Sequence, residues 1–298
     1  MNNYRKNLLI LHFTVLVFGL TGIFGKLLEE LGVDSMNIVF YRVLIGALGI
    51  GVYAGFSKKN LNIKSFKEFA TYVFIGSLIC FHWYFFFESI SLSNVSVALA
   101  TISTTSLFLA LLQPFLTSKK TALYEVLLGI VVILGLVIIL GYEFQYRWGI
   151  LYSLIAALLA AVFALLNSNL VQREDSTKIS FYEILSGAVL FGIILGFNNQ
   201  IVSPTEFTLE HWFWFGLLGL LATSFAFIAS VQVMKVLSAF TVSLTINLEP
   251  IYSIILALII FKESEHMSPQ FYLGALLILS TLFANAYFKK KERQKNPA

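Results

Sequence analysis

Residues 239–261, AFTVSLTINLEPIYSIILALIIF, decide the fold, because they are long enough to cross a bilayer and yet carry Glu249 and Pro250 near their middle. At about 1.5 Å per residue these 23 residues form a helix of roughly 34 Å, somewhat more than the hydrocarbon thickness of a membrane. An acid at that depth is costly unless it faces a polar cavity or a partner. Pro250 cannot donate to the carbonyl of Ile246, so it should kink the helix. Both residues therefore predict an internal site.

The composition predicts an integral membrane protein. Hydrophobic residues make up 58% of the chain and charged residues 12%, whereas soluble domains carry about 25% charged residues. The formal net charge of +4 does not indicate a nucleic-acid partner, because the basic residues lie in short loops and in the tail. The single cysteine, Cys80, excludes an internal disulfide and any cysteine-based metal cluster. We expect no bound metal and no cofactor.

Apolar segments of membrane-spanning length recur along the whole chain. They cover residues 8–28, 36–56, 69–90, 95–117, 123–141, 148–170, 181–197, 211–234, 239–261 and 269–288. The first segment follows Arg5 and Lys6, but it is longer than a signal-peptide core, so we expect it to be retained. The sequence therefore predicts an all-α, polytopic membrane protein with ten transmembrane helices joined by short loops.

Lysine and arginine predict the orientation, since cytoplasmic loops hold the excess of both. With the N terminus inside, 16 of the 20 basic residues fall on the cytoplasmic side, including the tail 289–295. Only Lys26, Arg147 and Lys262 fall outside, and Arg42 lies within the second segment. We therefore predict a multi-pass protein of the cell (inner or plasma) membrane, in contact with membrane lipids, with both termini cytoplasmic.

An internal repeat is suggested by sliding the chain along itself by 145 residues. Ten identical pairs result between residues 92 and 287, among them Leu128 with Leu273, Gly129 with Gly274 and Tyr142 with Tyr287. The shift aligns the first five segments (residues 1–145) with the last five (residues 146–298, including the basic tail). Because five is odd, the second repeat must enter from the opposite side, which is typical of secondary transporters with a site at the repeat interface.

Two segments related by this shift carry most of the candidate substrate-binding residues. Segment 239–261 offers Glu249 and Ser253, and segment 95–117 offers the hydroxyls of Thr101, Thr104 and Thr105. Spacings of three and four residues place each set on one face of a continuous helix. The alternative for the threonines is bonding to helix backbone or to a neighbouring helix. For Glu249 the alternative is a structural ion pair.

Four further candidates lie in other segments. Arg42 needs a carboxylate, backbone carbonyls or a path to the surface, so it is either structural or a contact for a substrate anion. His82 and Trp83 belong to an aromatic run and either line the cavity or pack, and His82 could titrate near neutral pH. Asn167, which the shift pairs with Gly22, offers a side-chain amide to a ligand.

The chain also resembles the EamA-type permeases of the drug/metabolite transporter superfamily. The residues that carry this resemblance are Phe18-Gly19, Arg42, Pro250, Lys262-Glu263 and Gly274. The first repeat departs from the family pattern, with Thr105 where a proline is common and Ser118 where an acid is common. The resemblance implies a central cavity lined mainly by the first, third, fourth, sixth, eighth and ninth helices, and export of small metabolites, such as amino acids, or of drugs.

These observations favour a secondary active transporter that works by alternating access. We expect a neutral, zwitterionic or aromatic solute, with Glu249 releasing a proton as substrate binds, so that protons are the coupling ion. An exchanger of phosphorylated or nucleotide-linked sugars is the alternative within the superfamily, and a scaffold or receptor is the alternative outside it. The sequence lacks GxxxxGK[ST], HExxH and GxSxG, so we do not expect an enzyme or an ATP-driven pump. The oligomeric state, including a homodimer, stays open.

Overall fold

The computed structural model describes residues 3–116, 122–237, 242, 245–246 and 248–295, and every regular element within them is helical. In chain order the elements are α1 (Asn3–Gly19), α2 (Thr21–Glu30), α3 (Ser35–Phe56), α4 (Phe66–Ser91), α5 (Val95–Ile102), α6 (Thr105–Leu116), α7 (Leu123–Tyr142), η1 (Phe144–Tyr146), α8 (Arg147–Leu170), α9 (Ser176–Phe197), η2 (Pro204–Glu206), α10 (Leu209–Gly216), η3 (Leu217–Phe225), α11 (Ala226–Val233), α13 (Glu249–Phe261), η4 (Lys262–Glu265) and α14 (Pro269–Lys295).

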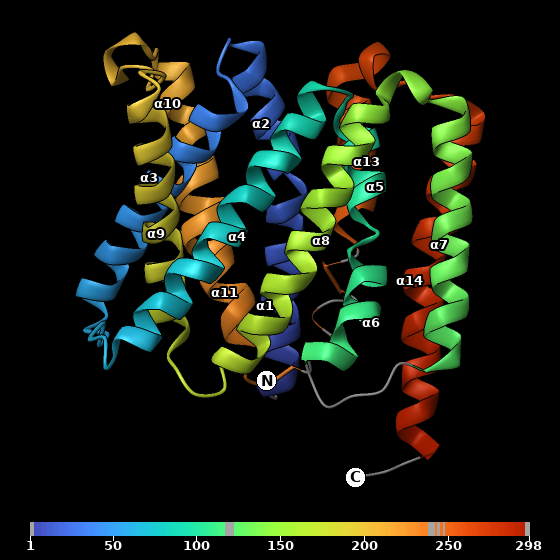
Figure 1. Ribbon diagram of the computed structural model, residues 1–298, viewed down its shortest axis with the longest axis horizontal. Coiled ribbons are helices and arrows are strands. Elements are labelled where there is room, and N and C mark those ends of the chain that lie inside the picture. The colour runs from blue at the N-terminus through green and yellow to red at the C-terminus, as the bar shows by residue number, and fades with distance from the viewer. Residues whose placement is uncertain (1–2, 117–121, 238–241, 243–244, 247, 296–298) are drawn as a thin grey trace.

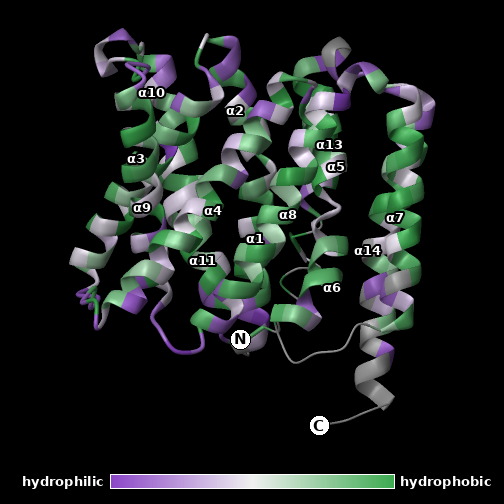
Figure 2. Cartoon of the chain, viewed as in Figure 1, coloured by the Kyte–Doolittle hydropathy of each residue, from purple (hydrophilic) through white to green (hydrophobic). Residues whose placement is uncertain are grey.

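The helices have the length and composition of membrane spans. Eight helical stretches in the described part are long and apolar enough to cross a bilayer, and two shorter apolar helices, Glu249–Phe261 and Pro269–Asn285, fall on the last two predicted segments. Hydrophilic residues gather at the two ends of the bundle, with mostly hydrophobic residues between them (Figure 2). The predicted all-α, polytopic membrane fold is therefore confirmed.

The bundle is long in one direction, and its two edges are built differently (Figure 1). At one edge α7 and α14 stand side by side, and at the other lie α3, α9 and α10. Gly135 and Gly274 allow the close approach of α7 and α14, because a Cβ on either residue would lie 2.8 Å from the carbonyl oxygen of the other. Both termini lie at the same end of the bundle, which we call the terminal face, and the other end is the opposite face.

Two helices are interrupted at matching positions. The segment predicted as one kinked helix around Pro250 contains a new helix start, because α13 begins at Glu249 with Pro250 in its first turn. Residues 238–241, 243–244 and 247 of that segment lie outside the described part. Helix α5 ends at Ile102 and α6 begins at Thr105, so this break lies 145 residues before the start of α13, the shift that aligns the predicted repeats.

A buried carboxylate closes the opposite face. Glu265, which is 0% exposed, accepts hydrogen bonds from the backbone N–H groups of Val95 at 3.0 Å and Ser96 at 2.8 Å, the first two residues of α5. It also pairs with the Lys26 Nζ at 3.0 Å. An anion at a helix N-terminus satisfies N–H groups that have no partner within the helix. These four residues, which we call the Glu265 clamp, tie α2, α5 and η4 together.

Candidate functional site

A cavity of about 220 Å³ lies in the middle of the bundle. Its lining comes from α1 and α2, α4, α5 and α6, α8, α11, the described residues before α13, and the start of α13, together with Arg42 of α3. These are the first, third, fourth, sixth, eighth and ninth predicted segments plus one residue of the second. On α6, α8 and α11 the lining residues lie toward the terminal face, whereas on α4 they lie in the half that ends at the opposite face. The volume suits a small organic solute rather than one or two water molecules.

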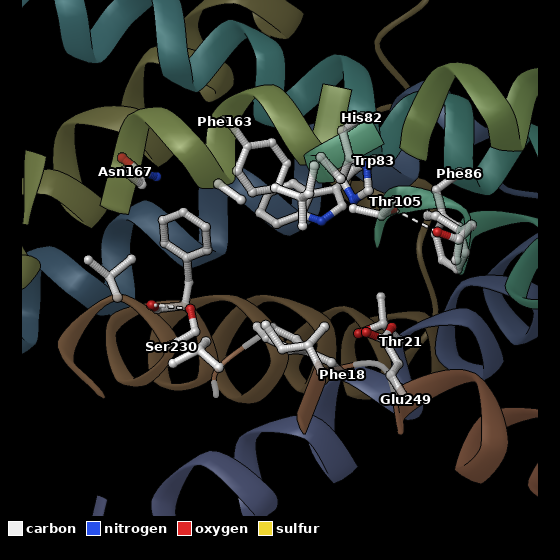
Figure 3. Close-up of a pocket in the computed structure, with 18 of the residues that line it drawn as sticks. Phe18, Thr21, His82, Trp83, Phe86, Thr105, Phe163, Asn167, Ser230 and Glu249 are labelled. Atoms are coloured by element: carbon white, nitrogen blue, oxygen red, sulfur yellow. Dashed lines mark hydrogen bonds between the residues drawn. The ribbon is translucent and has the colours of Figure 1, made fainter. Parts of the chain in front are cut away.

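Glu249 places an acid in the cavity at a helix start. Because Pro250 cannot continue a helix from its N-terminal side, α13 begins at Glu249, and the carboxyl group lies in the first turn of that helix. In Figure 3 Glu249 lies beside Thr21. The Thr21 hydroxyl is buried and has no hydrogen-bond partner among the described residues. This end of the cavity therefore offers a carboxylate and a hydroxyl to a donor group.

Aromatic rings form much of the remaining wall. Phe18, Phe86, Phe163 and Phe227 line the cavity with Trp83 and His82, and Figure 3 shows several of these rings between Glu249 and Asn167. The His82 ring meets the Phe163 ring edge-on, with the ring centroids 5.4 Å apart. The His82 Nδ1 lies 2.8 Å from the Ala156 carbonyl, which can only accept, so Nδ1 carries the proton. The wall is suited to stacking against a flat or apolar solute.

Arg42 also lines the cavity and lies against Trp83. It is 1% exposed, and its guanidinium is 3.9 Å from the centroid of the Trp83 ring, a cation–π distance. Its Nε donates to the Thr223 hydroxyl at 2.8 Å, and its Nη2 lies 3.5 Å from the Ala222 carbonyl. The Nη1 is buried and has no hydrogen-bond partner among the described residues. Arg42 thus adds a positive charge to the lining of the cavity, stacked against the Trp83 ring.

Six of the nine predicted site residues line this cavity: Glu249, Thr105, His82, Trp83, Asn167 and Arg42. Thr101, Thr104 and Ser253 do not, and each is 0% exposed. The prediction assumed one continuous helix through segment 95–117. Helix α5 ends at Ile102 and α6 begins at Thr105, and of the three threonines Thr105 alone lines the cavity.

Ser253 instead joins two helices. Its hydroxyl lies 2.6 Å from the carbonyl of Gly19, the last residue of α1, and 2.8 Å from the carbonyl of Glu249. One hydroxyl proton serves both carbonyls, so Ser253 fixes the start of α13 against the end of α1. The hydroxyls of Thr101 and Thr104 are buried without a hydrogen-bond partner in the described part.

The sequence reasoning missed several residues. Thr21, Ser230 and Phe18 line the cavity but are not among the predicted site residues. Glu183 was also missed, although it is 0% exposed and accepts a hydrogen bond of 3.0 Å from the Asn167 Nδ2. The predicted segment began at residue 181, which placed this acid at the membrane surface. Helix α9 begins five residues earlier, at Ser176, so Glu183 lies about two turns inside it.

Comparisons with known proteins agree with this architecture. A model of the EamA-like transporter family matches residues 5–141 and again residues 147–287, which confirms that the chain holds two repeats. A protein of Bacillus subtilis (strain 168) described as "Uncharacterized transporter YxxF" is 21% identical over 250 residues, which cover 82% of this chain and 78% of the relative. A crystal structure of another protein superposes with a TM-score of 0.67 at 17% identity, covering 94% of this chain and 96% of the other. At that identity the likeness shows the fold alone.

Proposed function

This chain belongs to the EamA-like transporter family, and from that premise we propose that it is a secondary active transporter that exports a neutral, zwitterionic or aromatic solute, such as an amino acid, by alternating access. The cavity carries the proposal, because it places the carboxyl group of Glu249 opposite a wall of aromatic rings in mid-bundle. The two repeats are the halves that rock about this site, inverted relative to each other. A scaffold would not need such a cavity.

The substrate class follows from the charges of the lining. Glu249 is suited to hold an ammonium group, since a hydrogen bond to an ionised partner is stronger than a neutral one. The rings of Trp83, Phe86 and Phe163 are suited to an apolar or aromatic side chain. Among the lining residues the structure describes, Arg42 is the one lysine or arginine. A phosphorylated or nucleotide-linked sugar needs more positive charge than one arginine supplies, and the Arg42 guanidinium already contacts Trp83 and Thr223, so that alternative is not favoured.

The orientation that we propose places the terminal face in the cytoplasm of the cell that carries the protein in its membrane. The loops between α3 and α4 and between α8 and α9 lie at that face and hold Lys59, Lys64 and Arg173. On α6, α8 and α11 the lining of the cavity extends toward the same face, and the Glu265 clamp lies at the other. The conformation described here is then the inward-facing one, ready to receive a cytoplasmic solute.

Counterflow in proteoliposomes tests the proposal. The purified protein is reconstituted, the vesicles are loaded with one unlabelled L-amino acid at a time, and entry of the same labelled amino acid is measured against empty liposomes. We expect exchange of one or more members of the panel. Glu249→Gln should lower that exchange at least about tenfold, because tenfold corresponds to about 1.4 kcal/mol and a hydrogen bond to a charged group contributes about 1.5–3 kcal/mol.

Glu30→Gln is the matched control, since it makes the same change at an exposed residue at the end of α2. It should leave exchange unchanged. If the wild type moves no member of the panel faster than empty liposomes do, the proposed substrate class is wrong. If Glu249→Gln exchanges as fast as the wild type, Glu249 is not a substrate contact.

A further inference from the structure

A second buried acid lies beside the cavity rather than in it. Glu183 is seven residues into α9, roughly 10 Å along the helix axis from Ser176, and is 0% exposed. On one side it is covered by α4 at Gly76, where a Cβ would lie 3.0 Å from the Cα of Glu183. The small residue lets the two helices approach so closely that no solvent layer separates them there.

The hydrogen bonds of Glu183 are incomplete. Its Oε2 accepts from the Asn167 Nδ2 at 3.0 Å, whereas its Oε1 and the Asn167 Oδ1 are both buried and have no partner among the described residues. Two acceptor oxygens are therefore left over on neighbouring side chains, and neither has a donor within hydrogen-bond distance among the described residues. Buried polar atoms without partners are rare in folded proteins and call for an explanation.

No described counter-charge serves Glu183. The titratable and charged groups on the helices packed against it include Arg42 on α3 and Tyr72, Cys80 and His82 on α4, with Lys178 and Tyr182 on α9 itself. Arg42 donates to Thr223 and Ala222, and Lys178 pairs with Glu68 and Glu174. No ion pair between Glu183 and any of these groups occurs in the described part. An ionised carboxylate without a counter-charge is strongly disfavoured at this depth of a membrane.

One added proton completes the arrangement. A protonated carboxyl group has one O–H donor, and a proton on Oε1 would let Glu183 donate to the Asn167 Oδ1 while Oε2 still accepts from Nδ2. The acid and the amide would then form a ring of two hydrogen bonds, with both leftover oxygens satisfied. Loss of the proton frees the Asn167 Oδ1, and Asn167 lines the cavity at the end away from Glu249 (Figure 3).

We propose that Glu183 is the proton-binding residue of this transporter and that Asn167 passes its protonation state to the cavity. With Glu183 protonated, the Asn167 amide is fully used. With Glu183 ionised, the freed Asn167 oxygen accepts a hydrogen bond from the ammonium, amide or hydroxyl group of a solute. Proton and solute then compete, which is the coupling that an antiporter needs. This inference rests on the proposed function, and it assigns the coupling proton to Glu183 rather than to Glu249.

Infrared spectroscopy of the protein in lipid vesicles tests the proton site without any solute. The carbonyl stretch of a protonated carboxylic acid is followed while the pH is raised from mildly acidic to mildly alkaline. We expect a band that fades over this range in the wild type and in Glu249→Gln, and that is missing in Glu183→Gln. A glutamine side chain has the shape of the acid and can form the same ring with Asn167, so the Glu183→Gln variant should fold.

A second variant keeps Glu183 and changes its hydrogen-bond partner, and the same infrared band is measured. Asn167→Leu removes the amide partner and should shift the frequency of the band, because the hydrogen bonds of the carbonyl change. The proposal is overturned if Glu183→Gln keeps the full band, or if no band titrates in the wild type. If Glu183→Gln does not fold, an unshifted band in Asn167→Leu overturns the proposal instead.

Transport measurements distinguish a failure of this proposal from a failure of the proposed function. With labelled L-phenylalanine as the probe, Glu183→Gln should slow counterflow, because its amide engages Asn167 as the protonated acid does, and the stimulation of uptake by a pH gradient should fall to the value without a gradient. Stimulation equal to that of the wild type would overturn the coupling role. If the wild type transports none of the tested amino acids, the proposed function is contradicted, and the infrared result alone decides whether Glu183 binds the proton.

Discussion

At the scale of single residues, the wall of the cavity depends on a cation held out of water. The Arg42 guanidinium lies beneath the Trp83 ring, and its planar fork is fixed by the Thr223 hydroxyl on the other side. The same hydroxyl donates to the Leu218 carbonyl at 2.8 Å. Thr223 thus accepts from the arginine and donates to the backbone of η3, so it connects the position of Trp83 to the π-helical turn of the eighth span.

Thr223→Val tests this connection. The change keeps the shape of the side chain but removes the acceptor of the Arg42 Nε, and a buried donor on a charged group left without a partner costs about 1–3 kcal/mol or more. We therefore expect the variant to unfold at a lower temperature in lipid-supplemented detergent.

Thr14→Val is the matched control. Thr14 is also 0% exposed, but within the described part of the chain its hydroxyl bonds only the Ile10 carbonyl of its own helix. The control should lose much less stability, because no charged donor is left unpaired. Equal losses for the two variants would show that the hydroxyl of Thr223 does not support Arg42.

At the scale of elements, the breaks in the fourth and ninth spans have different causes. The ninth span starts anew at Glu249 because Pro250 follows it. The fourth span has no proline at the matching place. There, the Ser103 hydroxyl bonds the Leu99 carbonyl at 2.9 Å and the Thr105 hydroxyl bonds the Ile102 carbonyl at 2.7 Å. Side chains of this type satisfy carbonyls that the helix no longer pairs.

Thr105→Pro should therefore be tolerated. Thr105 is the first residue of α6, where a helix requires no N–H and where proline is favoured. The variant loses the hydroxyl bond to Ile102, so we expect a loss of about 1 kcal/mol or less, within the range for one neutral hydrogen bond. Thermal unfolding and the yield of monodisperse protein measure the effect.

Ile133→Pro provides the contrast, because Ile133 lies in the interior of the unbroken helix α7 and is half exposed, so packing contributes little to its cost. It should lose about 3 kcal/mol or more. If Thr105→Pro is as damaging as Ile133→Pro, the break in the fourth span is not equivalent to that in the ninth.

These helices show which features of the fold can be predicted from the sequence and which cannot. Long apolar runs place helices reliably, since a membrane-spanning backbone must pair its own polar groups. The sequence does not show a helix break made by hydroxyls, because serine and threonine are also common inside unbroken spans. The face shared by Thr101, Thr104 and Thr105 was therefore predicted from a continuous helix that does not exist. Glu183 was missed for a related reason. The first turn of α9 contains the polar residues Ser176, Thr177 and Lys178, so an apolar run does not mark where the helix begins.

At the scale of the whole molecule, alternating access requires the two faces to differ in how firmly they are closed. The opposite face is held by the Glu265 clamp, in which one buried carboxylate joins segments more than 230 residues apart. At the terminal face Lys59 and Asp175 form an ion pair of 3.0 Å, with both side chains 36% exposed. Exposed ion pairs contribute about 0–1 kcal/mol, whereas removal of one partner from a buried pair costs about 3–5 kcal/mol. The clamp is thus a stronger lock than the Lys59–Asp175 pair, although Lys178, whose side chain is 4% exposed, also pairs with Glu68 at the terminal face.

Glu265→Gln should release that lock. Glutamine keeps the shape and can still accept from one N–H of α5, but the ion pair with Lys26 is lost. Breaking a buried ion pair destabilises the closed conformation by roughly 3–5 kcal/mol. A tenfold change in population needs only about 1.4 kcal/mol, so the population that is open at the opposite face should rise at least about tenfold. With a cysteine in place of the cavity residue Thr21 and Cys80→Ala in the background, a membrane-impermeant maleimide added outside intact cells should label the Glu265→Gln protein about tenfold faster.

Asp175→Asn, which removes the exposed pair at the terminal face, is the control and should leave the labelling rate unchanged. Equal labelling with and without Glu265→Gln would mean that the helix packing around the clamp, and not its charge, keeps the opposite face shut.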